Sequence, residues 1–116
     1  MAAVSICMAS TVLQASDEVV RQSEELHALP VAVTNNAVAS VKAGRREYVV
    51  SFNGLAEGKT HEDTLASTYV YDSRKKSWSE ADPVPGDAGR LASVAASAEE
   101  LVYVFGGYTV ADDGTE

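Results

Sequence analysis

The stretch "LVYVFGGY", residues 101–108, decides the fold that this sequence predicts. Its first half consists of β-branched and aromatic residues, which suit a buried strand. Two adjacent glycines, Gly106 and Gly107, follow. Glycine permits a positive φ and a close approach of neighbouring backbone, which a side chain would hinder. We therefore predict a buried strand that ends at a tightly packed position.

The same pattern occurs earlier in the chain. Residues 37–55, "AVASVKAGRREYVVSFNGL", align without a gap on residues 90–108, and eight of the nineteen pairs are identical. These pairs include Phe52 with Phe105 and Gly54 with Gly107, at an offset of 53. A period of about 50 residues is typical of repeat architectures. Each copy predicts two strands joined by a polar turn.

Two more strands are predicted between the copies. "STYVYD" at residues 67–72 and "WSEAD" at residues 78–82 flank the polar turn "SRKKS". "PVPGDAG" then interrupts the pattern, because proline does not continue a sheet. The sequence therefore predicts an all-β fold with one complete four-stranded propeller blade and the first two strands of a second. The expected boundaries are a leader at residues 1–25, a first blade at 26–86 and half of a second blade at 87–116.

A resemblance to a known family rests on motifs in a fixed order. Tyr71-Asp72 is followed by Trp78, a proline-containing connection, Arg90 and the double glycine. In this order they resemble a kelch repeat, in particular bacterial kelch-repeat β-propellers of the sialate-mutarotase and galactose-oxidase-like group. The resemblance implies a propeller scaffold with a ligand-binding channel face. The first repeat departs from the pattern, since Asn53 replaces its first glycine.

The length of the chain sets a problem for this fold. A blade is covered by the blades beside it, and a propeller has about four to eight of them. We therefore expect the remaining propeller blades as partners, with this chain as the N-terminal fragment of an incomplete propeller. Self-assembly into a ring and a two-layer fold with an open sheet remain alternatives.

The leader permits two interpretations. Residues 1–15 are mostly apolar and end in a small residue, as in a signal peptide, but no basic residue precedes Arg21. The alternative is a short helix capped at Ser16. The first interpretation predicts a periplasmic or secreted protein, and the second a cytoplasmic one.

Composition excludes several partners. The 17 acidic and 9 basic residues give a net charge of −8, which argues against nucleic acid and anionic membranes as partners. No apolar run approaches the roughly 18 residues that a membrane helix needs. Cys7 is the one cysteine, so the chain has no disulfide framework and cannot supply the whole copper site of galactose oxidase. We expect no metal and no cofactor.

Candidate binding residues lie in the loops that a kelch blade places on its channel face: Arg90, Asn35, Asn36 and His61. The Arg90 guanidinium could hold a carboxylate or pair with a nearby acid or carbonyl. The two asparagines could bind a sugar hydroxyl or cap a turn. His61, beside two acids, suggests acid–base chemistry, although adjacent loop residues rarely converge on one point.

The sequence identifies no catalytic residue, since it contains no nucleophile elbow and no phosphate loop. We therefore expect a scaffold that binds a carbohydrate or protein ligand through its loops. Part of a sialate-mutarotase-like sugar isomerase is one alternative, and an inactive truncated fragment is another.

Overall fold

The computed structural model describes residues 26–112, so the predicted leader at residues 1–25 lies outside the described part of the chain. The expectation of an all-β chain is confirmed for these residues. Strands alternate with short turns, and the single helical element is one 3-10 turn. The elements are β1 (Val33–Thr34), β2 (Ala37–Ala43), β3 (Arg46–Ala56), η1 (His61–Asp63), β4 (Thr64–Asp72), β5 (Ser77–Ala81), β6 (Leu91–Ala98) and β7 (Leu101–Tyr108).

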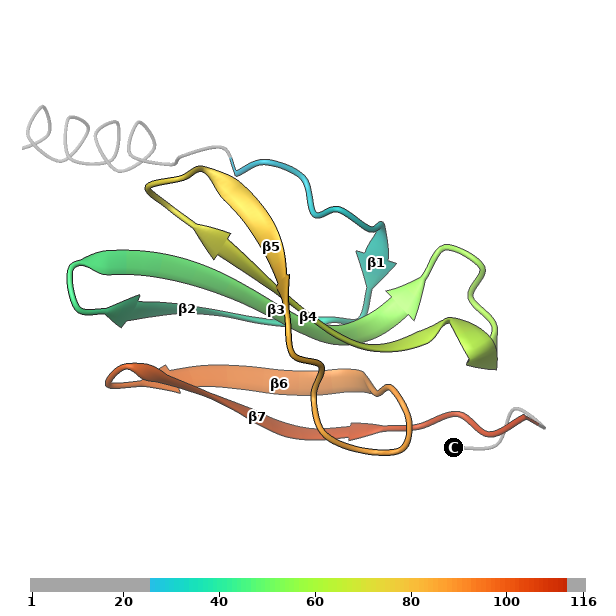
Figure 1. The fold of residues 1–116 in the computed structure, drawn as a ribbon. Helices are drawn as coiled ribbons and strands as arrows, with labels where there is room; N and C mark the ends of the chain where they lie inside the picture. Colours follow the sequence, from blue (N-terminus) through green and yellow to red (C-terminus); the bar gives the residue numbers. More distant parts are fainter. Residues whose placement is uncertain (1–25, 113–116) are drawn as a thin grey trace, which may run out of the picture.

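The first sheet, β1–β5, is antiparallel and curled (Figure 1). Strands β2, β3, β4 and β5 are neighbours in chain order, each joined to the next by a connection at one end of the sheet. The short strand β1 pairs with the last residues of β3, where Val33 lies opposite Ala56. Strands β1 and β2 therefore share one edge of β3, while β4 occupies the other.

Burial alternates along β2, the edge strand of this sheet that lies beside β6, and we call β2 and β6 the inner strands. Ala37 and Ala39 are buried, whereas Val38 and Ser40, the residues that follow each of them, are exposed. Because successive side chains of a strand point to opposite faces, the two alanines share one face. On that face Ala39 lies opposite the buried Val50 of β3. Small side chains here let another strand approach closely.

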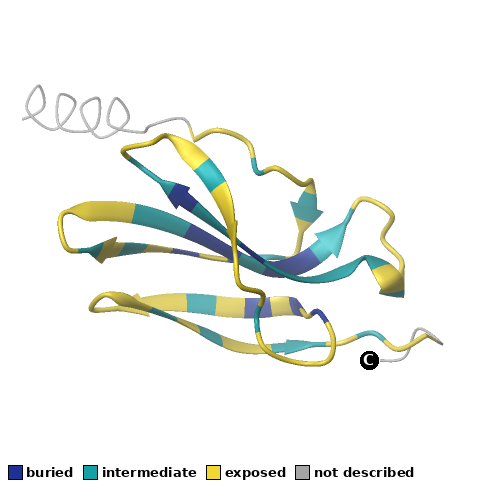
Figure 2. Ribbon diagram, viewed as in Figure 1, coloured by how far each residue is buried: buried dark blue, intermediate teal, exposed yellow. Residues whose placement is uncertain are grey.

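The second sheet is the hairpin β6–β7, and β6 is the strand that lies beside β2 (Figure 1). Leu91 and Ser93 of β6 are buried at this junction. Val94 and Phe105, whose side chains lie on the opposite side of the hairpin, are exposed, and much of the hairpin is yellow in Figure 2. The two inner strands therefore bring the alanine face of the first sheet against one face of the hairpin.

The repeat alignment without a gap is wrong for the inner strands. Ala37 pairs with Phe52, fifteen positions later, whereas Val94 pairs with Phe105, only eleven positions later. The second hairpin is thus four residues shorter. The offset of 53 holds between β3 and β7, but matching positions of β2 and β6 lie 57 residues apart.

Backbone geometry supports this corrected register. Asn35 and Ala92, 57 positions apart, both have a positive φ, 55° and 53°. The chain around Asn35 passes close to Gly54, which lies two residues after Phe52 of β3. In the same way, the chain around Ala92 passes close to Gly107, which lies two residues after Phe105 of β7. The position equivalent to Arg90 is therefore Val33, and not Ala37 as the alignment without a gap implies. Identities such as Ala39 with Ala92 are coincidences of a small-residue strand.

The connection between β3 and β4 spans residues 57–63. Strand β3 continues to Ala56 and β4 begins at Thr64. The pairing register between β3 and β4 shifts between Phe52 and Gly54, which marks a β-bulge in β3. Pairing with β4 resumes at Gly54. Glycine is required there, because a Cβ on Gly54 would meet the Thr34 carbonyl oxygen.

The two sheets are also joined at the far end from this loop. The backbone N–H of Gly44, in the β2–β3 turn, donates to Oε1 of Glu100, in the β6–β7 turn, at 2.9 Å.

No helix within residues 26–112 has the length and apolar character that crossing a membrane would require.

Candidate functional site

One end of the two sheets carries the connections that the sequence singled out, and we call it the loop end. It consists of residues 57–63, 82–90 and 109–112, which lie together in Figure 1. The hairpin turns at residues 44–45 and 99–100 lie at the opposite end, the turn end.

Backbone hydrogen bonds between the sheets hold the loop end together. The Gly54 N–H donates to the Arg90 carbonyl at 3.0 Å, and the Arg90 N–H donates to the Leu65 carbonyl at 3.3 Å. The Ala92 N–H donates to the Asn35 carbonyl at 3.2 Å. Strands β3, β4 and β6 are therefore fixed to one another at the start of β6, and the side chain of Arg90 is mounted on this rigid junction.

Arg90 is exposed and directly precedes β6. Among the described residues its side chain has one hydrogen-bond partner, since Nη1–H donates to the Gly107 carbonyl at 3.4 Å. This long contact engages one of the five N–H donors of a guanidinium. The contact holds the guanidinium beside the double glycine. The remaining N–H donors have the geometry to bind a carboxylate with two parallel hydrogen bonds.

Asn35 and Asn36 have different roles in the structure. Asn35 has a positive φ, a conformation that asparagine tolerates better than most residues, and its carbonyl accepts the bond from Ala92. Its side chain is exposed, and its backbone belongs to the same hydrogen-bonded junction as the backbone of Arg90. Asn36 instead donates from Nδ2 to the hydroxyl of Ser51 at 2.8 Å, so its side chain joins β3 to the segment before β2.

His61 begins η1, on the loop between β3 and β4. Its Nε2 lies 3.7 Å from Oδ1 of Asp112, a residue that follows β7. The histidine therefore contacts an acid from the other sheet rather than Glu62 or Asp63 beside it. Within residues 26–112, no three histidine, cysteine or acidic side chains come together as a metal site.

Asp63 organises the loop in front of His61. The Thr60 hydroxyl donates to its carboxylate at 2.6 Å, and the Thr60 N–H donates to it at 2.9 Å. The second of these contacts is one half of a capping box between Thr60 and Asp63. The hydroxyl contact, followed by the backbone N–H contact, holds the pKa of the Asp63 carboxyl below its usual value of 3.8. Asp63 is thus a structural carboxylate at neutral pH and fixes the loop that presents His61.

A buried polar contact at the junction was not predicted from the sequence. Asn53 is 4% exposed, and its Nδ2–H donates to the hydroxyl of Ser93, itself 7% exposed, at 3.2 Å. Its Oδ1 has no hydrogen-bond partner among the described residues. The signal was present, since Asn53 stands where the second repeat has Gly106, and both have a positive φ.

No protein-family model matches this sequence, and no curated protein matches it.

Proposed function

We propose that this chain is a binding module whose loop end recognises an anionic carbohydrate. In this proposal its strands are kelch-type propeller blades, with β2–β5 as one complete blade and β6–β7 as the first half of the next. The support for the blades is the chain-order arrangement of β2–β5, the position of β6 beside β2, and the repeated positive φ at Asn35 and Ala92.

The observation that carries the ligand proposal is that the first sheet holds the backbone of Arg90 in place. Its backbone N–H and carbonyl both bond to the first sheet, while its side chain is exposed at the loop end. A cation that is fixed by the scaffold before binding loses little conformational entropy when a ligand arrives. An exposed guanidinium binds planar carboxylates such as that of a uronic acid. Asn35 can add a hydrogen bond to a sugar hydroxyl from the same junction.

An NMR titration of the 15N-labelled chain with glucuronate, and with glucose as the neutral matched sugar, tests the ligand proposal. We expect glucuronate to shift the amide signals of Asn35, Arg90 and Gly107 but not that of Gly44 at the turn end. We expect Arg90→Gln to weaken binding at least about tenfold, the loss that follows removal of a charged hydrogen-bond donor. Arg74→Gln, which removes a charge at the other end, should leave binding unchanged.

Two results would reject the proposal: loop-end signals that glucuronate does not shift, or equal binding by the Arg90→Gln variant. The same samples report on the sugar-isomerase alternative. Faster exchange between the α and β anomers of glucuronate in the presence of the chain would favour an enzyme over a binding module.

A further inference from the structure

The hairpin β6–β7 has an apolar face that nothing in residues 26–112 covers, and we call it the outer hairpin face. Val94 lies opposite Phe105 and Ala96 opposite Tyr103, so these four side chains share one side. Val94 is 64% exposed and Phe105 is 57% exposed. The face is made of Val94, Ala96, Ala98, Leu101, Tyr103 and Phe105.

The corrected register identifies what this face corresponds to in the first sheet. Phe105 matches Phe52, and Val94 matches Ala37, which is 3% exposed. In the first sheet this side is the one that the hairpin β6–β7 covers. The outer hairpin face is therefore equivalent to a surface that is covered in the first sheet. By the same equivalence, the surface that would cover it matches the inward side of the hairpin β6–β7.

The chain has such a surface on the first sheet, on the side away from β6–β7. We call it the receiving face, and it includes Val38, Ser40 and Val49. By register, Val38 and Ser40 match Ala95 and Ser97 of β6. Val38 is half exposed. The receiving face thus corresponds to the hairpin surface that already packs against the first sheet within one chain.

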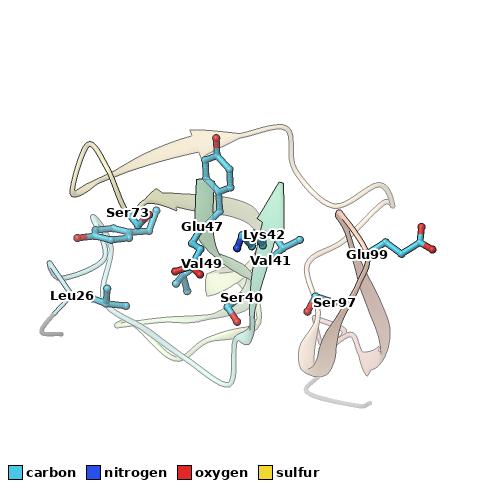
Figure 3. A pocket seen from close by; sticks show the side chains of 11 residues that line it. Leu26, Ser40, Val41, Lys42, Glu47, Val49, Ser73, Ser97 and Glu99 are labelled. Carbon is cyan, nitrogen blue, oxygen red and sulfur yellow. The ribbon is translucent and has the colours of Figure 1, made fainter. Parts of the chain in front are cut away.

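A cavity lies at the edge of the receiving face. It is open, has a volume of about 480 Å³ and is lined by Ser40 and Val49 of the first sheet together with Ser97 and Glu99 of the hairpin (Figure 3). The outer hairpin face carries a larger residue than the first sheet at the matching position, since Tyr103 corresponds to Val50.

We propose that the outer hairpin face of one chain docks onto the receiving face of a second copy, head to tail. The occupant is this chain itself, because it carries both surfaces and already contains one example of the same packing. A contact between two different faces leaves one free face at each end, so copies add until a ring closes or a filament forms. The inference does not depend on the ligand proposed for the loop end.

Complementation between two variants of the full chain tests this directly. Phe105→Glu disables the outer hairpin face, and Val38→Glu disables the receiving face; both residues are exposed, so each variant should keep its fold. By sedimentation velocity we expect the wild-type chain to form oligomers larger than a dimer as concentration rises. Each variant alone should be a monomer, and an equimolar mixture should form a heterodimer through its remaining intact faces. Glu62→Gln serves as the matched control and should assemble like the wild type.

Three outcomes would overturn the proposal. The first is a wild-type chain that stays monomeric at every concentration, in which case the outer hairpin face has another occupant. The second is a Val38→Glu variant that still dimerises while Phe105→Glu does not, which indicates two outer faces packed on each other. The third is a mixture of the two variants that remains monomeric. Circular dichroism of each variant verifies that a lost assembly is not a lost fold.

Discussion

Asn53 and Ser93 form a hydrogen bond of 3.2 Å between side chains that are buried at the junction of the two sheets. The bond joins the bulge that ends the aromatic part of β3 to the beginning of β6. Asn53 also has a φ of 58°, a conformation that costs most non-glycine residues about 1–2 kcal/mol and asparagine less. The residue therefore combines backbone strain with a contact that holds the second hairpin in place.

This pair gives a prediction with an internal comparison. Asn53→Ala should lower the free energy of unfolding by about 1–3 kcal/mol, because it removes a buried hydrogen bond and keeps a side chain at positive φ. Asn53→Gly removes the same bond but relieves the backbone strain, so it should cost less than Asn53→Ala. Urea unfolding followed by Trp78 fluorescence measures both. Equal stability of Asn53→Ala and the wild type would contradict the role assigned to the pair.

The two glycines at the end of β7 should differ strongly in their tolerance of alanine. A Cβ on Gly107 would meet the Ser93 hydroxyl oxygen and the Leu91 carbonyl, whereas a Cβ on Gly106 would meet nothing. Gly106→Ala should therefore cost only the strain of its positive φ, about 1 kcal/mol. Gly107→Ala should cost several times more or prevent the hairpin from packing. Urea unfolding of the two variants measures the loss in the free energy of unfolding. Equal losses for Gly106→Ala and Gly107→Ala would refute the close approach at Gly107.

Asp72 should make stability depend on pH. Burial acts to raise the pKa of its carboxyl, but hydrogen bonds from the Arg74 and Lys75 backbone N–H groups and the nearby positive charges of Arg46 and Lys75 outweigh it. The net effect is a pKa below the usual value of 3.8. A carboxyl with a lower pKa in the folded chain stabilises it above its unfolded pKa, and this contribution is lost as pH falls through the folded value.

Asp72→Asn should thus destabilise the chain at pH 7, and the difference from the wild type should vanish in strong acid. Urea unfolding at both pH values measures this, with the exposed Asp87→Asn as control. A difference that persists unchanged in strong acid would show that charge is not the cause.

Hydrogen exchange should distinguish β3 from β7, although the two strands match in the repeat. Strand β3 is paired on both edges, by β1 and β2 on one side and β4 on the other. Within the described residues, β7 pairs with β6 alone, so its outer edge is open. We expect outer-edge amides of β7 to exchange much faster than any amide from Tyr48 to Phe52. Equal protection of both strands would mean that β7 has a second neighbour.

The sequence predicted the positions of the strands well because their signals are local, but the expectation that β7 is buried is wrong, since Leu101, Tyr103 and Phe105 are exposed. Alternation in β2, aromatic and β-branched runs in β3, β4 and β7, and proline after β5 all act within a few residues of one another. The sequence could not predict which positions of the inner strands β2 and β6 correspond to each other. Small residues such as Ala39 and Ala92 match at many offsets, and a four-residue difference in hairpin length changes no composition.

The candidate site was predictable only in its position. The sequence placed Arg90 and His61 on connections that the structure gathers at the loop end, and Asn35 on a connection where its carbonyl accepts a hydrogen bond from Ala92. It could not show that Asn36 bonds to Ser51, because this contact depends on the pairing of β2 with β3. It could not show that His61 lies near Asp112 either, because that contact depends on how the two sheets pack. The Asn53–Ser93 pair was missed for the same reason.

The central claim is that the sheets pack side by side through β2 and β6, in the register that aligns Asn35 with Ala92. NMR measurement of scalar coupling across the hydrogen bond from the Ala92 N–H to the Asn35 carbonyl tests it most directly, together with NOEs between the two strands. We predict a measurable coupling between residues 35 and 92, with NOEs from the Ala37 and Ala39 methyl groups to β6. NOEs that stay within each sheet, with no coupling between these two residues, would contradict the account.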